Sequence, residues 1–157
     1  MKFFPSENET MIIAPSADQA QRILWKRVKP PANLSNTIPI SDSEFLFNGI
    51  VRDGRFRISL IINYPDNFLP LILGSIEDAP HGSLILVEYR LFFGTRLFLI
   101  FWILVTGLLG IYLVLVENLW SYGFLAFVLG GLNQVVTRYI FLKRVKKSSS
   151  VLHSLFH

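Results

Sequence analysis

Residues whose types suit chemistry gather in three places along this chain of 157 residues. His153 and His157 are four residues apart, so on a helix both imidazoles would share one face within reach of a metal ion. Zinc normally takes three or four ligands, and the sequence around these histidines supplies no third. We therefore predict no metal site there. The chain has no cysteine, which excludes disulfide scaffolds, thiolate metal sites and cysteine nucleophiles.

Acidic residues beside a predicted turn are the second candidate. Glu77, Asp78 and Glu88 lie near the mouth of a predicted hairpin, where Glu77 and Glu88 could face each other for acid–base chemistry. Carboxylates at the edge of a sheet are usually solvated, and their pKa values shift only in buried or strongly charged surroundings. The chain also lacks the phosphate-binding, nucleophile-elbow and metalloprotease motifs. The sequence predicts no catalytic residue, no cofactor and no enzyme activity.

The third candidate is a basic cluster formed by Lys143, Arg144, Lys146 and Lys147. It follows an apolar segment directly, and such charges attract anionic lipid headgroups with about 1 kcal/mol each. The same charges also fix the orientation of a membrane protein, and we favour this topological role. The cluster has no interleaved aromatic residues, and residues 1–90 are nearly neutral, so we expect no nucleic-acid binding.

The second half of the sequence contains two long apolar segments with few charged residues. Hydrophobic residues form 52% of the chain and charged residues only 17%, whereas soluble domains carry about 25% charged residues. Residues 97–116 contain no charge and have the length that crosses a bilayer. Residues 119–142 form a second, more polar segment after a short link. The pattern predicts a transmembrane helical hairpin over residues 91–142.

The charges around this hairpin predict its orientation. The link between the two segments carries Glu117 and no basic residue. The opposite side carries Arg90, Arg96, Arg138 and the basic cluster. By the positive-inside rule both termini lie in the cytoplasm, and we expect the cytoplasmic (inner) membrane of a bacterium. The residues after Met1 lack the apolar stretch of a signal peptide, which agrees with a cytoplasmic N-terminal part.

Small residues recur with helical spacing in the two apolar segments and predict how the helices pack. Lipid gives no hydrophobic drive for helix association, so close backbone approach and interhelical hydrogen bonds must supply it. The expected seam consists of Gly107 and Gly110 on the first helix and Gly123, Ala126, Gly130 and Asn133 on the second. We expect Asn133 to turn toward protein rather than lipid, because an unpaired amide in lipid is costly. The same seam would also permit contact with a partner subunit.

Residues 1–90 predict a cytoplasmic α+β domain with the order β-α-β-β-β-β. Ser16 and Gln19 form a capping-box pattern that begins a helix, and Pro30 and Pro31 end it. Residues 30–43 are rich in Pro and small polar residues and predict a loop. The closely spaced strands indicate an antiparallel meander with the helix on one face. The predicted strands are 9–14, 45–52, 55–63, 71–77 and 83–90.

Alternation along these strands predicts the buried face. Two strand faces are expected to form a core: Phe45, Phe47 and Val51 on one strand, and Phe56, Ile58, Leu60 and Ile62 on the next. The apolar stripe of the helix that would cover them consists of Ala20, Ile23, Leu24 and Val28. Alternatively, the domain binds a lipid or a small apolar ligand in a pocket lined by Phe45, Phe47, Phe56 and Phe68.

A longer pattern runs through residues 47–87. It reads Phe47-x-Gly49-x-Val51, Phe56-x-Ile58, Asn63-Tyr64-x-x-Asn67-Phe68-x-Pro70-x-x-x-Gly74-x-Ile76 and Gly82-x-x-Ile85-x-Val87. The pattern resembles an uncharacterised family of small bacterial membrane proteins. That resemblance implies an N-terminal α+β domain followed by two membrane helices, and it supplies no catalytic residue.

These observations predict a non-enzymatic, two-span membrane protein. We expect an interaction or accessory module, such as a small subunit of a larger membrane assembly. Its partners would be membrane lipids and either other membrane-protein subunits or further copies of the chain. Residues 143–157 are expected to form a basic cytoplasmic tail, and its apolar residues would dock on the domain, lie on the membrane or bind a partner.

Overall fold

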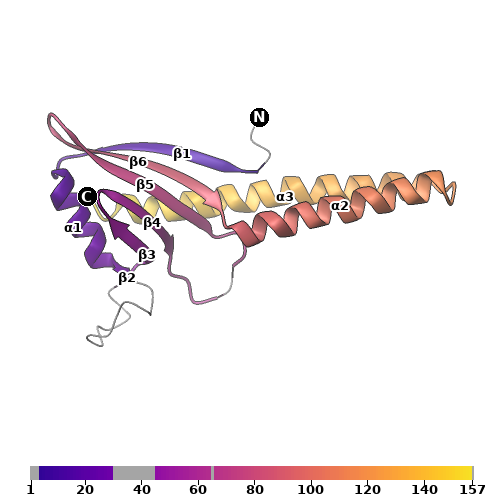
Figure 1. The fold of residues 1–157 in the computed structure, drawn as a ribbon, viewed down its shortest axis with the longest axis horizontal. Helices are drawn as coiled ribbons and strands as arrows, with labels where there is room; N and C mark the ends of the chain where they lie inside the picture. The colour runs from indigo at the N-terminus through magenta and orange to yellow at the C-terminus, as the bar shows by residue number, and fades with distance from the viewer. Residues whose placement is uncertain (1–3, 30–44, 65, 157) are drawn as a thin grey trace.

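A computed structural model describes residues 4–29, 45–64 and 66–156 of the chain. It shows a six-stranded sheet with helices on one face, joined to a long two-helix hairpin (Figure 1). The predicted loop at 30–43 lies outside the described residues. In chain order the elements are β1 (Ser6–Ile13), α1 (Ala17–Arg27), β2 (Val28–Lys29), β3 (Phe47–Arg52), β4 (Arg55–Leu60), β5 (Pro70–Ala79), β6 (Gly82–Leu91), α2 (Phe93–Leu115) and α3 (Trp120–His153).

The α+β class is confirmed, but the sheet is not a simple meander. Its strand order is β1-β6-β5-β4-β3-β2, and β2 runs parallel to β3 whereas all other neighbours are antiparallel. Only β3 to β6 follow one another as a meander. The short strand β2 was not predicted, and β1 lies beside β6 rather than beside β3, because α1 carries the chain from one edge of the sheet to the other. Strands on either side of this helix therefore lie farthest apart.

Local sequence signals explain α1 and the core beneath it. The hydroxyl of Ser16 accepts a hydrogen bond from the backbone N–H of Gln19, and the side chain of Gln19 accepts one from the N–H of Ser16. The helix ends two residues before the predicted end, because Val28 and Lys29 are extended and pair with β3. Most of the predicted core is buried, namely Ala20, Leu24, Val28, Phe47, Phe56, Ile58 and Leu60. The other predicted core residues are half-buried: Ile23, Phe45, Val51 and Ile62.

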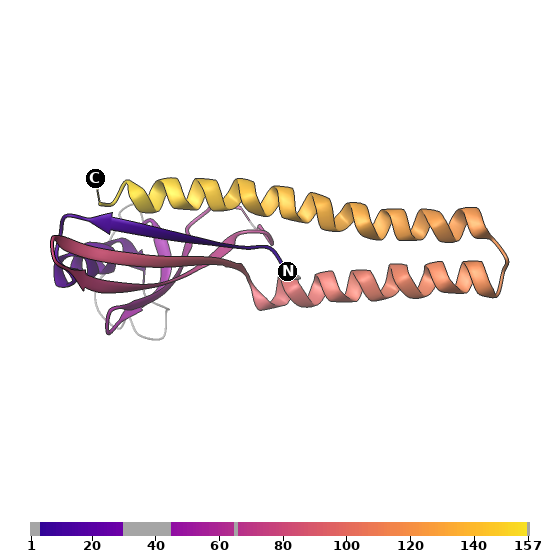
Figure 2. The same ribbon diagram turned by 90° about the horizontal axis from the view of Figure 1, so that it is seen from above.

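Helix α3 corrects the predicted domain boundary. Residues 143–157 were expected to form a separate tail, but α3 continues without a break from Trp120 to His153. Phe141, Val145 and Leu152 are buried in the same core as α1 and the strands. These three apolar positions recur with the helical period, so the second half of α3 has one face that can cover the sheet. Figure 2 shows α3 passing from the hairpin along the sheet.

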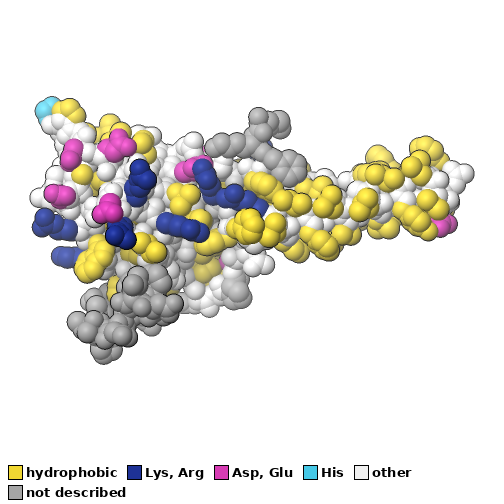
Figure 3. All heavy atoms as spheres, in the orientation of Figure 1, with side chains coloured by type: hydrophobic (Ala, Val, Ile, Leu, Met, Phe, Trp, Pro, Cys, Tyr) yellow, Lys and Arg dark blue, Asp and Glu magenta, His cyan; other side chains and the backbone are white. Residues whose placement is uncertain are grey.

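The first half of α3 lies beside α2 in the hairpin (Figure 2). Both helices are long and apolar enough to span a membrane, and their most apolar windows are only 11% and 17% buried. Large aliphatic and aromatic side chains cover the surface of the hairpin (Figure 3). Exposed apolar side chains therefore occur along the whole length of the hairpin.

Candidate functional site

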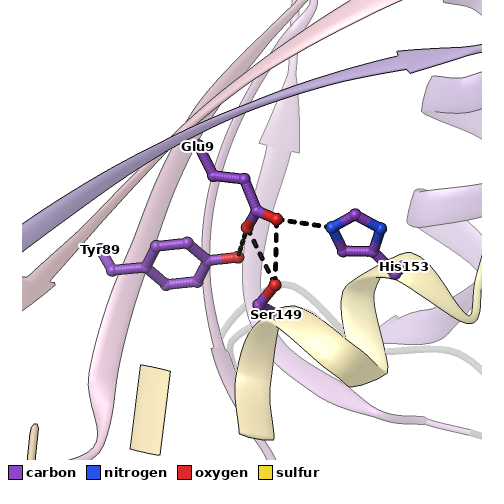
Figure 4. Close-up of polar contacts among 4 residues, drawn as sticks. All are labelled: Glu9, Tyr89, Ser149 and His153. Carbon is purple, nitrogen blue, oxygen red and sulfur yellow. Dashed lines mark hydrogen bonds and ion pairs between the residues drawn. The ribbon is translucent and has the colours of Figure 1, made fainter. Parts of the chain in front are cut away.

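Four polar side chains meet where α3 crosses the edge of the sheet (Figure 4). The carboxylate of Glu9 on β1 accepts a hydrogen bond from the hydroxyl of Tyr89 on β6 at 2.8 Å. The hydroxyl of Ser149 on α3 donates to both carboxylate oxygens, at 3.1 and 2.9 Å. One turn farther, Nε2 of His153 lies 2.6 Å from Oε1 of Glu9. We call these four residues the Glu9 cluster.

The surroundings shift the pKa values within the Glu9 cluster. Partial burial raises the pKa of Glu9, but the hydrogen bonds from His153, Tyr89 and Ser149 outweigh this effect and leave the pKa lowered. Burial, together with the bond to Glu9, raises the pKa of the Tyr89 phenol well above its usual value. The cluster therefore holds an ionised carboxylate beside a neutral phenol at neutral pH.

The geometry of the Glu9 cluster suits a structural clamp. A hydrolytic triad needs the serine hydroxyl to pass its proton to the histidine. Here Ser149 and His153 both direct their polar groups at Glu9, and no contact among the described residues joins them to each other. The carboxylate thus ties the second half of α3 to β1. Sequence reasoning considered His153 only with His157, which lies outside the described residues, and no local pattern connects it to Glu9, 144 positions away.

The basic cluster divides into two parts. Nε of Arg144 lies 2.6 Å from Oδ2 of Asp66, whose side chain is only 7% exposed. The Arg144 guanidinium also donates to the hydroxyl of Tyr64 at 3.0 Å and lies over its ring. Arg144 thereby anchors the connection between β4 and β5 to α3. The other three members, Lys143, Lys146 and Lys147, are exposed and stay available for the predicted topological or lipid-binding role.

Most of the small residues of the expected seam lie between α2 and α3. A Cβ atom on Gly123 would lie 2.9 Å from the carbonyl oxygen of Gly110, and one on Gly130 would lie 2.7 Å from Oγ1 of Thr106. Ala126 is buried beside them. These positions let the two backbones approach closely.

Gly107 and Asn133 depart from this arrangement. A Cβ atom on Gly107 would have no neighbouring heavy atom within 4 Å, since the contact side of α2 follows Thr106 and Gly110 and the next residue is rotated by about 100°. Asn133 is half-buried, and its amide nitrogen is shielded without a hydrogen-bond partner among the described residues.

The acidic residues near the β5–β6 turn do not form a pair. Glu77 lies opposite Leu84 and Glu88 lies opposite Leu73, so the expectation that the two carboxylates face each other is wrong. Asp78 instead accepts a hydrogen bond from the backbone N–H of Ala17 at the start of α1. Across the described part of the chain, no three His, Cys, Asp or Glu side chains gather as metal ligands.

The molecule also has two concave surfaces that could hold a ligand. One lies on the face of the sheet away from the helices, between β1, β4, β5 and β6, and includes Arg55, Leu73 and Glu88. The other is a groove of about 450 Å³ where the sheet domain meets the start of α2. Phe47 and Phe56, expected to line a ligand pocket, are core residues instead, and Phe68 lines the second groove.

Comparison with known proteins leaves the family open. No model of a known protein family matches the chain, and no curated protein sequence matches it significantly. Among solved structures, the solution NMR structure of a polyketide-cyclase-like protein from Corynebacterium glutamicum aligns with 94% of this chain and 97% of its own. The two share 12% sequence identity with a TM-score of 0.31.

Proposed function

We propose that the chain is a two-span membrane protein whose sheet domain is held in a fixed orientation at the cytoplasmic surface and docks a partner subunit. The observation that carries this proposal is the continuity of α3. Its first half belongs to the hairpin and its second half to the core of the domain. A hinge between domain and membrane would need a break in this helix, so the domain follows every tilt of the hairpin.

The dimensions and surface of the hairpin support insertion into a bilayer. The 23 residues of α2 span about 34 Å at 1.5 Å per residue, against about 30 Å for the hydrocarbon core. At the far end, Trp120 and Tyr122 are exposed, as suits side chains at a membrane–water interface. At the domain end, Arg96 and Arg138 would lie at the opposite interface, which favours cytoplasmic termini.

Two serine-to-cysteine variants test the orientation. Ser121 lies near the tip of the hairpin and Ser150 near the end of α3, and both are exposed. The chain has no native cysteine, so each variant carries a single thiol. We expect a membrane-impermeant thiol reagent to label Ser121→Cys in intact cells, and Ser150→Cys only after the membrane is opened. The reverse pattern would place the domain outside the cytoplasm, and labelling of both in intact cells would argue against insertion.

The face of the sheet turned away from the helices is the proposed docking surface. Arg55 and Arg57 project from this face of β4, opposite the buried Phe56 and Ile58, and their guanidinium groups form no ion pair or hydrogen bond among the described residues. Figure 3 shows basic side chains on this side of the domain, separated by apolar patches. Two neighbouring guanidinium groups that form no ion pair fit a protein surface that presents acidic side chains beside apolar ones.

A double charge reversal tests this surface. We expect Arg55→Glu with Arg57→Glu to release the partner when the protein is extracted from its own membranes in mild detergent and its native mass is recorded. The expected loss in affinity is about tenfold or more, because like charges then oppose each other across the interface. A matched control reverses Arg22 and Lys26, which lie exposed one turn apart on α1.

The outcomes separate the alternatives. A partner that is lost in the β4 variant and retained in the α1 variant supports docking on the sheet. A native mass equal to a multiple of the 18.0 kDa chain, with no other subunit, would replace the proposed partner by further copies of the chain. A bare monomer from native membranes, or equal loss in both variants, would contradict the proposal.

A further inference from the structure

If the hairpin spans a bilayer, it fixes the depth of every segment at its base. Twenty residues of helix cover about 30 Å, so a hydrocarbon core that ends near Val116 at the tip begins near Leu97. Gly130 on α3 lies beside Thr106 on α2, which is nine residues from Leu97. Tyr139 is nine residues from Gly130 and therefore marks the same depth on α3. Outside this depth lies a headgroup layer about 5–7 Å thick.

The connection between β4 and β5 reaches this layer from a distant part of the chain. Its described residues, 61–64 and 66–69, run beside the start of α2 (Figure 1). The hydroxyl of Thr95 donates to the backbone carbonyl of Asn67 at 2.6 Å. Thr95 lies only about 3 Å outside Leu97 along the helix. The backbone of Asn67 therefore lies within the headgroup layer.

Arg144 on α3 holds a second point of this connection at a similar depth. Its guanidinium donates to the hydroxyl of Tyr64 at 3.0 Å, and its Nε lies 2.6 Å from Oδ2 of Asp66. The backbone of Arg144 lies about 7.5 Å outside Tyr139, and helical side chains tilt toward the N-terminus of their helix, which for α3 is the membrane side. The backbone N–H of Phe68 donates to Oδ1 of Asp66 at 2.9 Å and fixes the turn.

The side chains at this depth suit a membrane–water interface. Tyr64 is 47% exposed, and a tyrosine combines an apolar ring with a hydroxyl, as is typical of residues among headgroups. Phe93 at the start of α2 and Tyr139 on α3 are about 70% exposed and extend the same belt around the base. Asp66 is only 7% exposed and pairs with Arg144, so the connection turns no free carboxylate toward anionic headgroups.

We propose that the connection between β4 and β5 is a third membrane anchor of the chain, lying among the phospholipid headgroups on the domain side of the bilayer. Two adjacent helices leave the domain free to lean to either side of their common plane. A third contact beside them opposes that motion. This inference rests on the proposed insertion of the hairpin. It differs from the predicted attraction of anionic lipids to Lys143, Lys146 and Lys147, because it uses a segment of the sheet domain.

Three single-cysteine variants labelled with bimane measure the depth of each segment, since the chain has no native cysteine. Asn67→Cys places the probe on an exposed residue of the connection. Gly107→Cys places it near the middle of the membrane span, where a Cβ atom meets no heavy atom within 4 Å. His81→Cys places it in the β5–β6 turn, at the end of the domain farthest from the hairpin (Figure 1).

The measurement is bimane fluorescence of the full chain in phosphatidylcholine vesicles that contain a lipid with a nitroxide on its headgroup or in the middle of its acyl chain. The headgroup nitroxide should quench most of the fluorescence at Asn67→Cys and little at His81→Cys. The acyl-chain nitroxide should quench Gly107→Cys. Adding Arg144→Gln should release the connection and restore fluorescence at Asn67→Cys. Lys143→Gln removes the same charge from an exposed neighbour and should leave the quenching unchanged.

The outcomes separate the anchor from the insertion. Quenching at Asn67→Cys no stronger than at His81→Cys, while the acyl-chain nitroxide quenches Gly107→Cys, would overturn the anchor and leave the inserted hairpin intact. Absence of quenching at Gly107→Cys would contradict the insertion and the anchor with it. Equal effects of Arg144→Gln and Lys143→Gln would overturn the assignment of Arg144 as the residue that holds the connection at the membrane.

Discussion

Replacing Phe141 by alanine is expected to lower the free energy of unfolding of the sheet domain by about 3–5 kcal/mol. The ring of Phe141 is fully buried in the core that α3 shares with the sheet. Its removal leaves a cavity that this one-layer sheet cannot close without moving α3. Since α3 is also a hairpin helix, the same change should loosen the link between domain and membrane.

The matched control is Phe124→Ala, which makes the same substitution on the same helix at a side chain that is 70% exposed. We expect a change of about 0.5 kcal/mol or less there. Urea unfolding in mild detergent, followed by the circular dichroism of the sheet, measures both variants. Similar values for the two would mean that the second half of α3 does not pack on the sheet.

Local patterns in the sequence were sufficient to predict several structural features. The hydroxyl of Ser16 and the amide of Gln19 lie three residues apart, so their contacts depend on neighbouring residues alone. The turn at Asp53-Gly54 likewise follows from residue type, because both residues have positive φ, at 50° and 70°. Alternation predicted the burial of Phe47 and Phe56, since a strand with one covered face repeats every second residue.

Contacts between distant segments could not be predicted in the same way. The pairing of β1 with β6 and the contact of Glu9 with His153 join residues about 80 and 144 positions apart, and many alternative pairings fit the same local patterns. The second half of α3 has a clear apolar stripe, but its lysines resemble the charged end of a membrane span. We interpreted those charges as a boundary, although one helix can carry a lipid-facing half and a domain-covering half.

Replacing Gly123 by alanine is expected to destabilise the hairpin by about 1–3 kcal/mol. The added methyl group would lie 2.9 Å from the carbonyl oxygen of Gly110 and would also meet Val114. A backbone oxygen cannot rotate away as a flexible side chain can, so the two helices must separate locally. Separation loses packing contacts, which are a main source of helix association in lipid.

Gly107→Ala provides a control with the opposite expected sign. Its methyl group meets no heavy atom within 4 Å, and alanine favours a helix over glycine by up to about 1 kcal/mol. Titration of the detergent-solubilised protein with sodium dodecyl sulfate, followed by loss of helix, compares the two variants. If both alanines stabilise the monomer, the small residues do not hold α2 against α3. If Gly123→Ala instead lowers only the native mass of an assembly, the seam at Gly123 contacts another subunit, and the hairpin must be held by the connection at its tip and by the domain.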